Sequence, residues 1–211
     1  MKCLELFSGT HSVGKCCKEI GIDVLSLDID GRADINISIL EWDYKVYKKD
    51  EFDIIWASPP CDRYSCLNYS NIGRKLKRLN GDELTMDLIK EGWEEADKLV
   101  IKTIEIINYF NPELWFIENP STSTLKNRPF MKDIFFYDVD YCMYSDYGYK
   151  KPTRIWTNKK DWNALKCNGK CNNMNGKKHK NNMCSVNMSG ENRLDLRHRV
   201  PPNLIYSLLM N

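Results

Sequence analysis

Three short segments of the sequence combine residue types that can perform nucleophilic chemistry. Cys61 follows two consecutive prolines, and a cysteine is nucleophilic near neutral pH and can leave again by elimination. Glu118 and Asn119 place an acid and an amide directly after an apolar run, and Gly9 lies in a turn that lets a ligand approach the backbone. Each segment alone is equally well explained as a rigid turn, a helix cap or a common glycine turn. Only their combination indicates an active site.

The three segments follow predicted β-strands, which must position them. Short apolar runs predict strands at residues 3–7, 23–28, 52–57 and 114–117, and a helix is expected at residues 12–20. This alternation is typical of βαβ units and predicts an α/β fold with a mostly parallel sheet. Because ligands of open α/β sheets bind beyond the carboxyl ends of the strands, the three segments are expected at one edge of the sheet.

The remaining sequence predicts one long helix, two further strands and a closing helix. The long helix at residues 83–110 follows a polar, basic loop at residues 62–82, and the strands are expected at residues 134–142 and 153–157. A short helix should follow the prolines at 201–202. The apolar stripe of the long helix is expected to consist of Leu84, Leu88, Trp93, Ala96, Leu99, Val100, Ile104 and Ile107.

The composition restricts the function classes. The chain has 211 residues, a net charge of +2 and no apolar run long enough to span a bilayer, which predicts a single soluble, intracellular domain without membrane contact. Nine cysteines without a secretion signal favour reduced thiols over a disulfide framework. We expect a monomer or a weak dimer.

Five segments, in chain order, carry a resemblance to a known family. They are residues 4–9, the Pro-Cys pair at 60–61, the Glu-Asn pair at 118–119, residues 147–158 and residues 199–202. Together they resemble the cytosine-5 DNA methyltransferase family, in the form found in compact phage and large-DNA-virus members. The resemblance spans nearly the whole chain and implies a Rossmann-like methyltransferase fold, with helices on both faces of the sheet.

The resemblance also implies a division of the chain. Residues 1–160 should form the catalytic and cofactor-binding domain, residues 161–192 a very small target-recognition segment, and residues 193–211 a segment that returns to the catalytic domain. With so small a recognition segment, the target should be a short site, such as CpG or a GC-type dinucleotide.

The implied chemistry assigns roles to residues of the motifs. The Cys61 thiolate should add to carbon 6 of cytosine, which makes carbon 5 nucleophilic, while Glu118 stabilises the charge at ring N3. Asn119 should position that carboxyl group, and the Pro60 carbonyl should accept a hydrogen bond from the cytosine amino group. The resemblance implies that Arg154 contacts ring O2 and the thiolate.

The basic motif around Arg154 departs from the family's pattern. The usual Gln-x-Arg-x-Arg appears here as Lys151-x-Thr153-Arg154, so Thr153 and Lys151 are expected to share the role of the arginine.

S-adenosylmethionine is the cofactor that the resemblance implies. Asp28 or Asp30 should bind the ribose hydroxyls, and Ile29 should pack on the adenine. His11 stands where the family usually has a second glycine, and Ser38 where it usually has an aspartate. The cofactor-binding residues are expected to be Phe7, Ser8, Gly9, Thr10, His11, Ser12, Asp28, Ile29, Ser38, Ser58 and Pro59.

Double-stranded DNA is the implied partner, and a paired cytosine must be flipped out to reach Cys61. The basic loop that follows the nucleophile could contact phosphates, although a merely solvated loop would have the same composition. The candidate DNA-binding residues are Arg63, Ser65, Arg74, Lys75, Lys77, Arg78 and Lys151. Two other functions remain open, which are cytosine-5 methylation of tRNA and DNA binding by a catalytically silent relative.

Four residues of the recognition segment have the types that bind zinc. Cys167, Cys171, His179 and Cys184 could form a tetrahedral site, although their spacing departs from common zinc fingers and knuckles. The alternative is a flexible, lysine-rich loop that contacts DNA.

Overall fold

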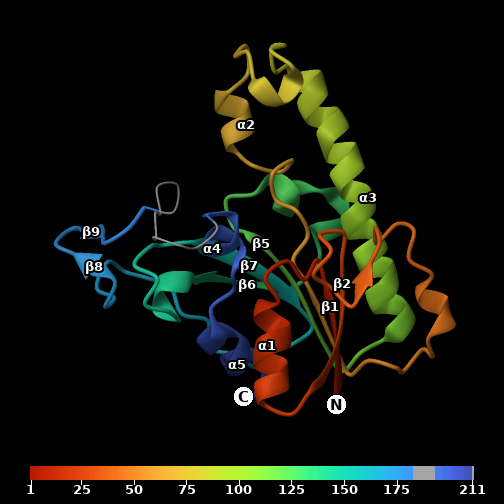
Figure 1. Cartoon of the computed structure of the whole chain (residues 1–211). Coiled ribbons are helices and arrows are strands. Elements are labelled where there is room, and N and C mark those ends of the chain that lie inside the picture. The colour runs from red at the N-terminus through yellow and green to blue at the C-terminus, as the bar shows by residue number, and fades with distance from the viewer. Residues whose placement is uncertain (183–192, 211) are drawn as a thin grey trace.

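One mixed sheet forms the centre of the computed structural model, which describes residues 1–182 and 193–210 (Figure 1). The strand order is β3-β2-β1-β4-β5-β7-β6. Strand β7 runs antiparallel to both neighbours, and the other pairs are parallel. The mostly parallel α/β fold is therefore confirmed. The strands are β1 (Lys2–Leu6), β2 (Asp23–Asp28), β3 (Ile35–Asn36), β4 (Ile54–Ala57), β5 (Leu114–Pro120), β6 (Phe136–Asp140) and β7 (Pro152–Thr157).

Helices cover both faces of this sheet because alternate strand residues are apolar on each side. Leu6, Ala57 and Ile117 pack in the core beneath α3 (Met86–Phe110). Their neighbours Trp56 and Phe116 belong to the opposite core, beneath α1 (Ser12–Glu19) and α5 (Pro202–Leu209). In Figure 1, α1 and α5 lie together on one side of the sheet and α3 on the other.

The long helix begins after a capping residue, and its buried face matches the predicted stripe except at Leu88. The Thr85 side chain accepts a hydrogen bond from Leu88 N. Leu88 itself is 37% exposed, whereas Ile89 and Phe110 are buried. The rest of the predicted stripe is confirmed, since Leu84, Ala96, Val100 and Ile107 are buried and Trp93, Leu99 and Ile104 pack against the core. The buried face also includes Asp97, a polar residue that an apolar pattern cannot detect. The residues buried on the helix are Ile89, Gly92, Ala96, Asp97, Val100, Thr103, Ile106, Ile107 and Phe110.

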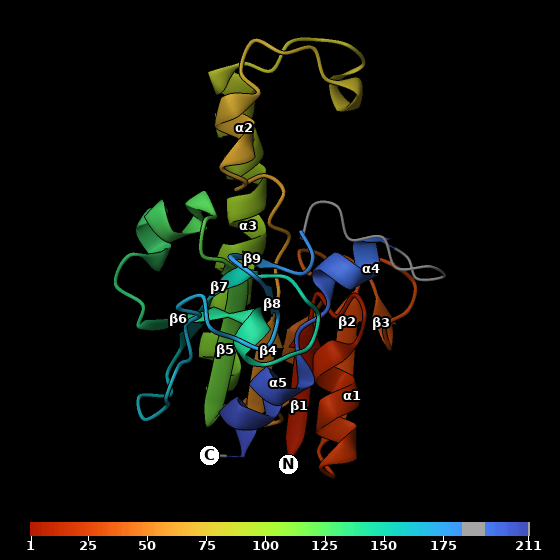
Figure 2. The ribbon, with the colours of Figure 1, turned by 90° about the vertical axis from the view of Figure 1, so that its left-hand side faces the viewer.

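Residues 62–85, which we call the arm, project beyond the carboxyl edge of the sheet (Figures 1 and 2). The sequence predicts a loop here, but the structure places α2 (Leu67–Ser70) and the 3-10 helix η2 (Lys77–Leu79) in it. An isolated antiparallel β-bridge between Lys75 and Glu83 joins the two sides of the arm.

Small elements complete the described chain. The predicted strand at 134–142 ends at Asp140 and continues as η5 (Tyr141–Met143). A two-stranded hairpin of β8 (Met174–Asn175) and β9 (Lys178–His179) follows, and α4 (Arg193–His198) precedes α5. The other 3-10 helices are η1 (Tyr44–Val46), η3 (Thr124–Asn127) and η4 (Pro129–Met131). Within residues 1–182 and 193–210, no helix has the length and apolar character needed to cross a membrane.

Candidate active site

The Cys61 loop is fastened to the strand that carries Glu118. Strands β4 and β5 are parallel neighbours, so the loop after Ala57 emerges beside Glu118. Asn119 Nδ2 donates a hydrogen bond of 2.9 Å to the carbonyl oxygen of Pro59. Pro59 is buried, Pro60 is exposed, and Cys61 is partly buried. The amide of Asn119 therefore holds the loop that carries Cys61.

The Glu118 carboxylate is buried and has two partners. The Tyr141 hydroxyl donates to Oε1 at 2.8 Å, and Lys151 Nζ lies 3.8 Å from the same oxygen. Lys151 Nζ also donates to the carbonyl oxygen of Arg197 at 3.1 Å and lies 4.7 Å from the centre of the Tyr141 ring. Among the described residues no hydrogen-bond partner is found for Oε2 of Glu118, so this oxygen is available to a ligand.

Two opposite charges act on the Cys61 thiol. Burial is the largest cause and raises the pKa of Cys61 above its ordinary value. The ammonium of Lys151 opposes this shift, whereas the carboxylate of Glu118 adds to it. Burial therefore dominates the pKa of Cys61, and the charges of Lys151 and Glu118 act on it in opposite directions.

Arg154 does not join this cluster, because the sheet register turns it away. Glu118 pairs with Ile155 and Asn119 with Arg154, so Arg154 lies on the face opposite to Glu118. Its guanidinium makes a bidentate ion pair with Asp138, at 2.7 and 2.9 Å, and stacks on the Phe136 ring. Arg154 therefore lies away from Cys61, although the resemblance to the family implied a contact between the two.

Thr153 and Lys151 lie on the side of Glu118. Thr153 is fully buried, and its hydroxyl donates to the carbonyl oxygen of Lys151 at 3.2 Å. Burial raises the pKa of Tyr141 well above its ordinary value, so this phenol remains a hydrogen-bond donor. Lys151, named from the sequence as a DNA contact, supplies the cation nearest to the acid.

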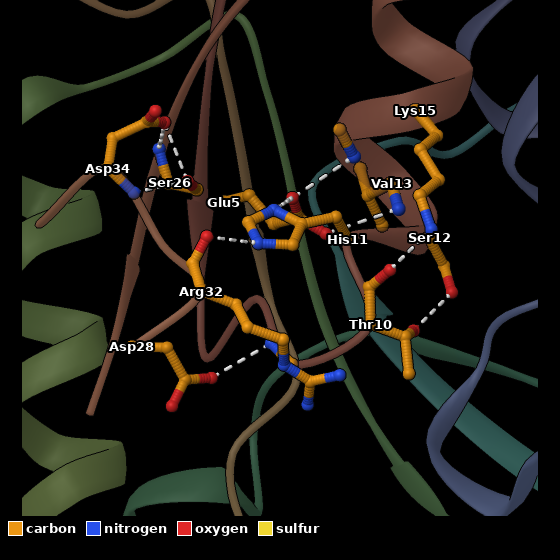
Figure 3. Close-up of polar contacts among 12 residues, drawn as sticks. Glu5, Thr10, His11, Ser12, Val13, Lys15, Ser26, Asp28, Arg32 and Asp34 are labelled. Carbon is orange, nitrogen blue, oxygen red and sulfur yellow. Dashed lines mark hydrogen bonds and ion pairs between the residues drawn. The ribbon is translucent and has the colours of Figure 1, made fainter. Parts of the chain in front are cut away.

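The glycine turn at the end of β1 adopts an unusual backbone. Phe7, Gly9 and His11 all have positive φ angles, of 57°, 44° and 56°. Gly9 N donates to Asp28 Oδ2 at 2.8 Å, which joins the ends of β1 and β2 (Figure 3). Beside that carboxylate, Ile29 is 76% exposed. An exposed isoleucine next to an acid can pack against the base of a nucleoside whose ribose the acid binds.

Glu5 organises this turn, and the sequence analysis did not select it. This buried side chain accepts hydrogen bonds from Val13 N and Gly14 N, both at 3.1 Å, at the start of α1. Its Oε2 also lies 3.7 Å from His11 Nδ1, while His11 Nε2 meets the carbonyl oxygen of Arg32 at 2.9 Å (Figure 3). The available signal was an acid inside an apolar strand, two residues before the turn.

The C-terminal segment meets the same turn. Val200 N donates to Ser12 Oγ at 3.1 Å, and Asp195 of α4 forms an ion pair with Arg32. A cavity of about 420 Å³ lies between these parts. Its lining includes Thr10 and Ser12 of the turn, Arg32, and Arg199 of the C-terminal segment.

Three serines among the candidate cofactor residues differ in their hydrogen bonding. Ser8 Oγ is buried and has no hydrogen-bond partner among the described residues. Ser58 Oγ accepts a bond from Trp56 Nε1, and Ser38 Oγ accepts one from Leu40 N. The lone hydroxyl of Ser8 fits a site for a polar ligand, whereas the other two serines are engaged locally.

The basic residues of the arm are exposed, and three of them, Arg63, Arg74 and Arg78, contact neighbouring side chains. Arg63 pairs with Glu95 at 3.6 Å, and Arg78 donates to Asn68 Oδ1 at 2.9 Å. Ser65 Oγ accepts a weak bond from Leu67 N at 3.4 Å. The exposed cations of the arm are Arg63, Arg74, Lys75, Lys77 and Arg78.

The structure brings together three of the four candidate zinc ligands. Cys167, Cys171 and His179 lie close to one another, and the buried Cys142 joins them. The sequence analysis did not select Cys142, which is distant in the chain from the other three. Cys184 lies outside the described residues.

The fold and the site define a doubly wound α/β protein with a thiol and a carboxylate at the carboxyl ends of neighbouring strands. The chain is 39% identical, over 99% of both sequences, to the protein of Frog virus 3 (isolate Goorha) described as "Probable DNA (cytosine-5)-methyltransferase". The chain therefore belongs to the DNA (cytosine-5)-methyltransferase family. No protein-family model matches it.

Solved structures with partial similarity cover most of the chain. Dnmt2 methyltransferase of S. pombe matches 78% of it at 11% identity, with a TM-score of 0.49. The methyltransferase EhMeth of Entamoeba histolytica matches 79% at 13% identity, with a TM-score of 0.48. The chain spans about half the length of these proteins, namely 52% and 57%.

Proposed function

We propose that this protein transfers a methyl group from S-adenosylmethionine to carbon 5 of a flipped-out cytosine in double-stranded DNA. The observation that carries the proposal is that the Cys61 loop and the buried Glu118 lie at the carboxyl ends of neighbouring parallel strands, where Asn119 is hydrogen bonded to the loop and Lys151 lies beside the acid. A thiol that adds to the ring and an acid that neutralises ring charge are the groups this reaction requires.

The glycine turn has features that suit S-adenosylmethionine. Ser8 contributes a buried hydroxyl that has no partner in the described part of the chain, Asp28 a carboxylate at the end of β2, and Ile29 an exposed apolar surface. Asp28 would hold the ribose, Ile29 the adenine, and the backbone near Gly9 the methionine part. When bound, the cofactor supplies a methyl group on a positively charged sulfur.

Each residue of the cluster has a task in the reaction. The Cys61 thiolate adds to carbon 6 of the ring, and the nearby Lys151 ammonium favours that thiolate. Glu118 Oε2 shares a proton with ring N3, and this hydrogen bond stabilises the negative charge that builds on the ring when the thiolate adds. After methylation, loss of the carbon 5 proton releases Cys61 by elimination, and the thiolate is restored. Tyr141 and Asn119 hold the acid and the Cys61 loop in place.

We propose that the arm binds the DNA backbone. It projects beyond the edge where Cys61 lies, and its exposed lysines and arginines can neutralise phosphates around an extruded base (Figure 2). Residues 161–192 would contribute target recognition next to the catalytic residues 1–160. The viral source of the 39% identical relative supports action inside infected cells.

A mechanism-based trap tests the proposal. Duplex DNA that contains 5-fluorocytosine should form a covalent adduct with the protein in the presence of S-adenosylmethionine, because fluorine at carbon 5 blocks the elimination step. Cys61→Ser should abolish the adduct, whereas Cys66→Ser, at an exposed cysteine nearby, should retain it. Binding of DNA without any adduct would contradict the proposed catalysis, and adducts formed with tRNA but not duplex DNA would contradict the proposed substrate.

A further inference from the structure

A second cluster of reactive side chains lies outside the proposed active site. The ligand atoms of Cys142, Cys167, Cys171 and His179 all lie within 4.8 Å of one another. Cys142 is buried in η5, whereas the other three residues belong to the segment after residue 160. Three thiols and an imidazole are a ligand set that zinc prefers.

The distances within the cluster match those of a tetrahedral metal site. His179 Nε2 lies 3.6 Å from Cys167 Sγ and 3.4 Å from Cys171 Sγ. Zinc bond lengths place such nitrogen and sulfur ligands about 3.6 Å apart at a tetrahedral angle. The side chains are therefore already arranged around a space that one ion would fill.

The backbone around the cluster supports the ligands. Gly169 N donates to Cys167 Sγ at 3.4 Å, a contact that stabilises a metal-bound thiolate. The buried Asn173 donates to the carbonyl oxygens of Cys142 and Ser145, at 2.8 and 2.7 Å, and accepts a bond from Gly148 N. These bonds attach the segment to η5 at the point where Cys142 enters the cluster.

The hairpin that carries His179 is held by hydrogen bonds at its two ends but is too short to form a core of its own. Its strands, Met174–Asn175 and Lys178–His179, contain two residues each, and isolated short hairpins are marginal in water. Of this hairpin, Asn175 and Lys178 are exposed. A metal that joins the hairpin to a buried cysteine would supply the missing stability.

We propose that Cys142, Cys167, Cys171 and His179 bind a structural zinc ion. This site replaces the ligand set of the sequence analysis, with Cys142 in the position given there to Cys184. Cys142 directly follows Tyr141, whose hydroxyl holds Glu118. The ion thus fixes the recognition segment to the element that orients the catalytic acid. This role goes beyond the methyl transfer itself.

Metal analysis of the 211-residue chain, purified without chelators, tests the site. We expect one zinc ion per chain by plasma mass spectrometry, and a spectrum of tetrahedral cobalt thiolate after exchange with Co²⁺. Cys142→Ser and Cys171→Ser should lose the ion or bind it at least tenfold more weakly. Cys66→Ser and Cys184→Ser should retain it.

The variants separate the proposal from a failure to fold. Cys171 lies on the small segment rather than in a sheet core, so Cys171→Ser should keep the circular dichroism and the S-adenosylmethionine affinity of the parent protein. Chelation should also increase protease cleavage of the segment after residue 160. The proposal is overturned by a chain that takes up no metal, or by zinc that survives Cys142→Ser but not Cys184→Ser. Neither the metal content nor the protease cleavage depends on whether the protein methylates DNA.

Discussion

Lys151 Nζ lies 3.8 Å from Glu118 Oε1, at the end of β5, and is held there by the carbonyl oxygen of Arg197. Arg197 belongs to α4, so the C-terminal segment positions a cation beside the proposed catalytic acid. The same cation lowers the pKa of Cys61 against the effect of burial. One lysine therefore connects the acid, the nucleophile and the returning segment.

Removing this cation should make the nucleophile harder to ionise. Because Lys151 lowers the pKa of Cys61, Lys151→Ala should raise that pKa. The pH dependence of Cys61 alkylation by iodoacetamide should then move to higher pH. Lys150→Ala is the matched control, since Lys150 pairs with Asp140 instead. Identical alkylation profiles for Lys151→Ala and the parent protein would contradict the assigned contact.

Neutralising the acid should have two opposite effects. Glu118 raises the pKa of Cys61, so Glu118→Gln should lower that pKa and speed alkylation at neutral pH. Methyl transfer should nevertheless fall by about 10²–10⁴-fold, because the group that stabilises charge at ring N3 is lost. Glu113→Gln, at an exposed residue just before β5, should change neither rate. A purely structural role of Glu118 would slow both reactions together.

The lysines of the arm should determine the salt dependence of DNA binding. If Lys75 and Lys77 each neutralise one phosphate, the double alanine variant should reduce the slope of log K against log salt by about 1.8. Lys18 on α1 and Lys48 after η1 are exposed but lie off the arm, so their double variant should leave the slope unchanged. Fluorescence anisotropy with a labelled duplex at several salt concentrations measures both. Equal slopes for the two variants would show that Lys75 and Lys77 do not neutralise DNA phosphates, and would contradict the proposed role of the arm.

Local sequence patterns were sufficient to predict most strands of the sheet and which residues lie at its carboxyl edge. Strand β2 was predicted to the residue, and α1 and β1 to within one residue, because each apolar run ends at a glycine or an acid. The positions of Cys61 and Glu118 followed from the rule that parallel strands end at one edge.

Contacts between distant parts of the chain were beyond these patterns. Arg154 and Lys151 are three residues apart, and only the register of β7 against β5 decides which one lies near Glu118. Cys142 is 25 residues from Cys167, so no spacing rule relates them. Glu5 also escaped notice, because its partners Val13 and Gly14 meet it only after α1 has folded back on β1.

His11 should make the stability of the protein depend on pH through the glycine turn at the end of β1. The pKa of His11 is raised, chiefly by its contact with the Glu5 carboxylate, so the protonated ring stabilises the folded state. A raised folded-state pKa contributes stability below the unfolded value of about 6.5, and this contribution is lost as the pH rises through the folded value. His11→Asn is the informative variant, since asparagine tolerates the φ of 56° but carries no charge. Thermal unfolding should therefore show a larger advantage of the parent protein at pH 6 than at pH 8.5. An advantage that is the same at both values would mean that the ring acts only through its hydrogen bond to Arg32 and not through its charge.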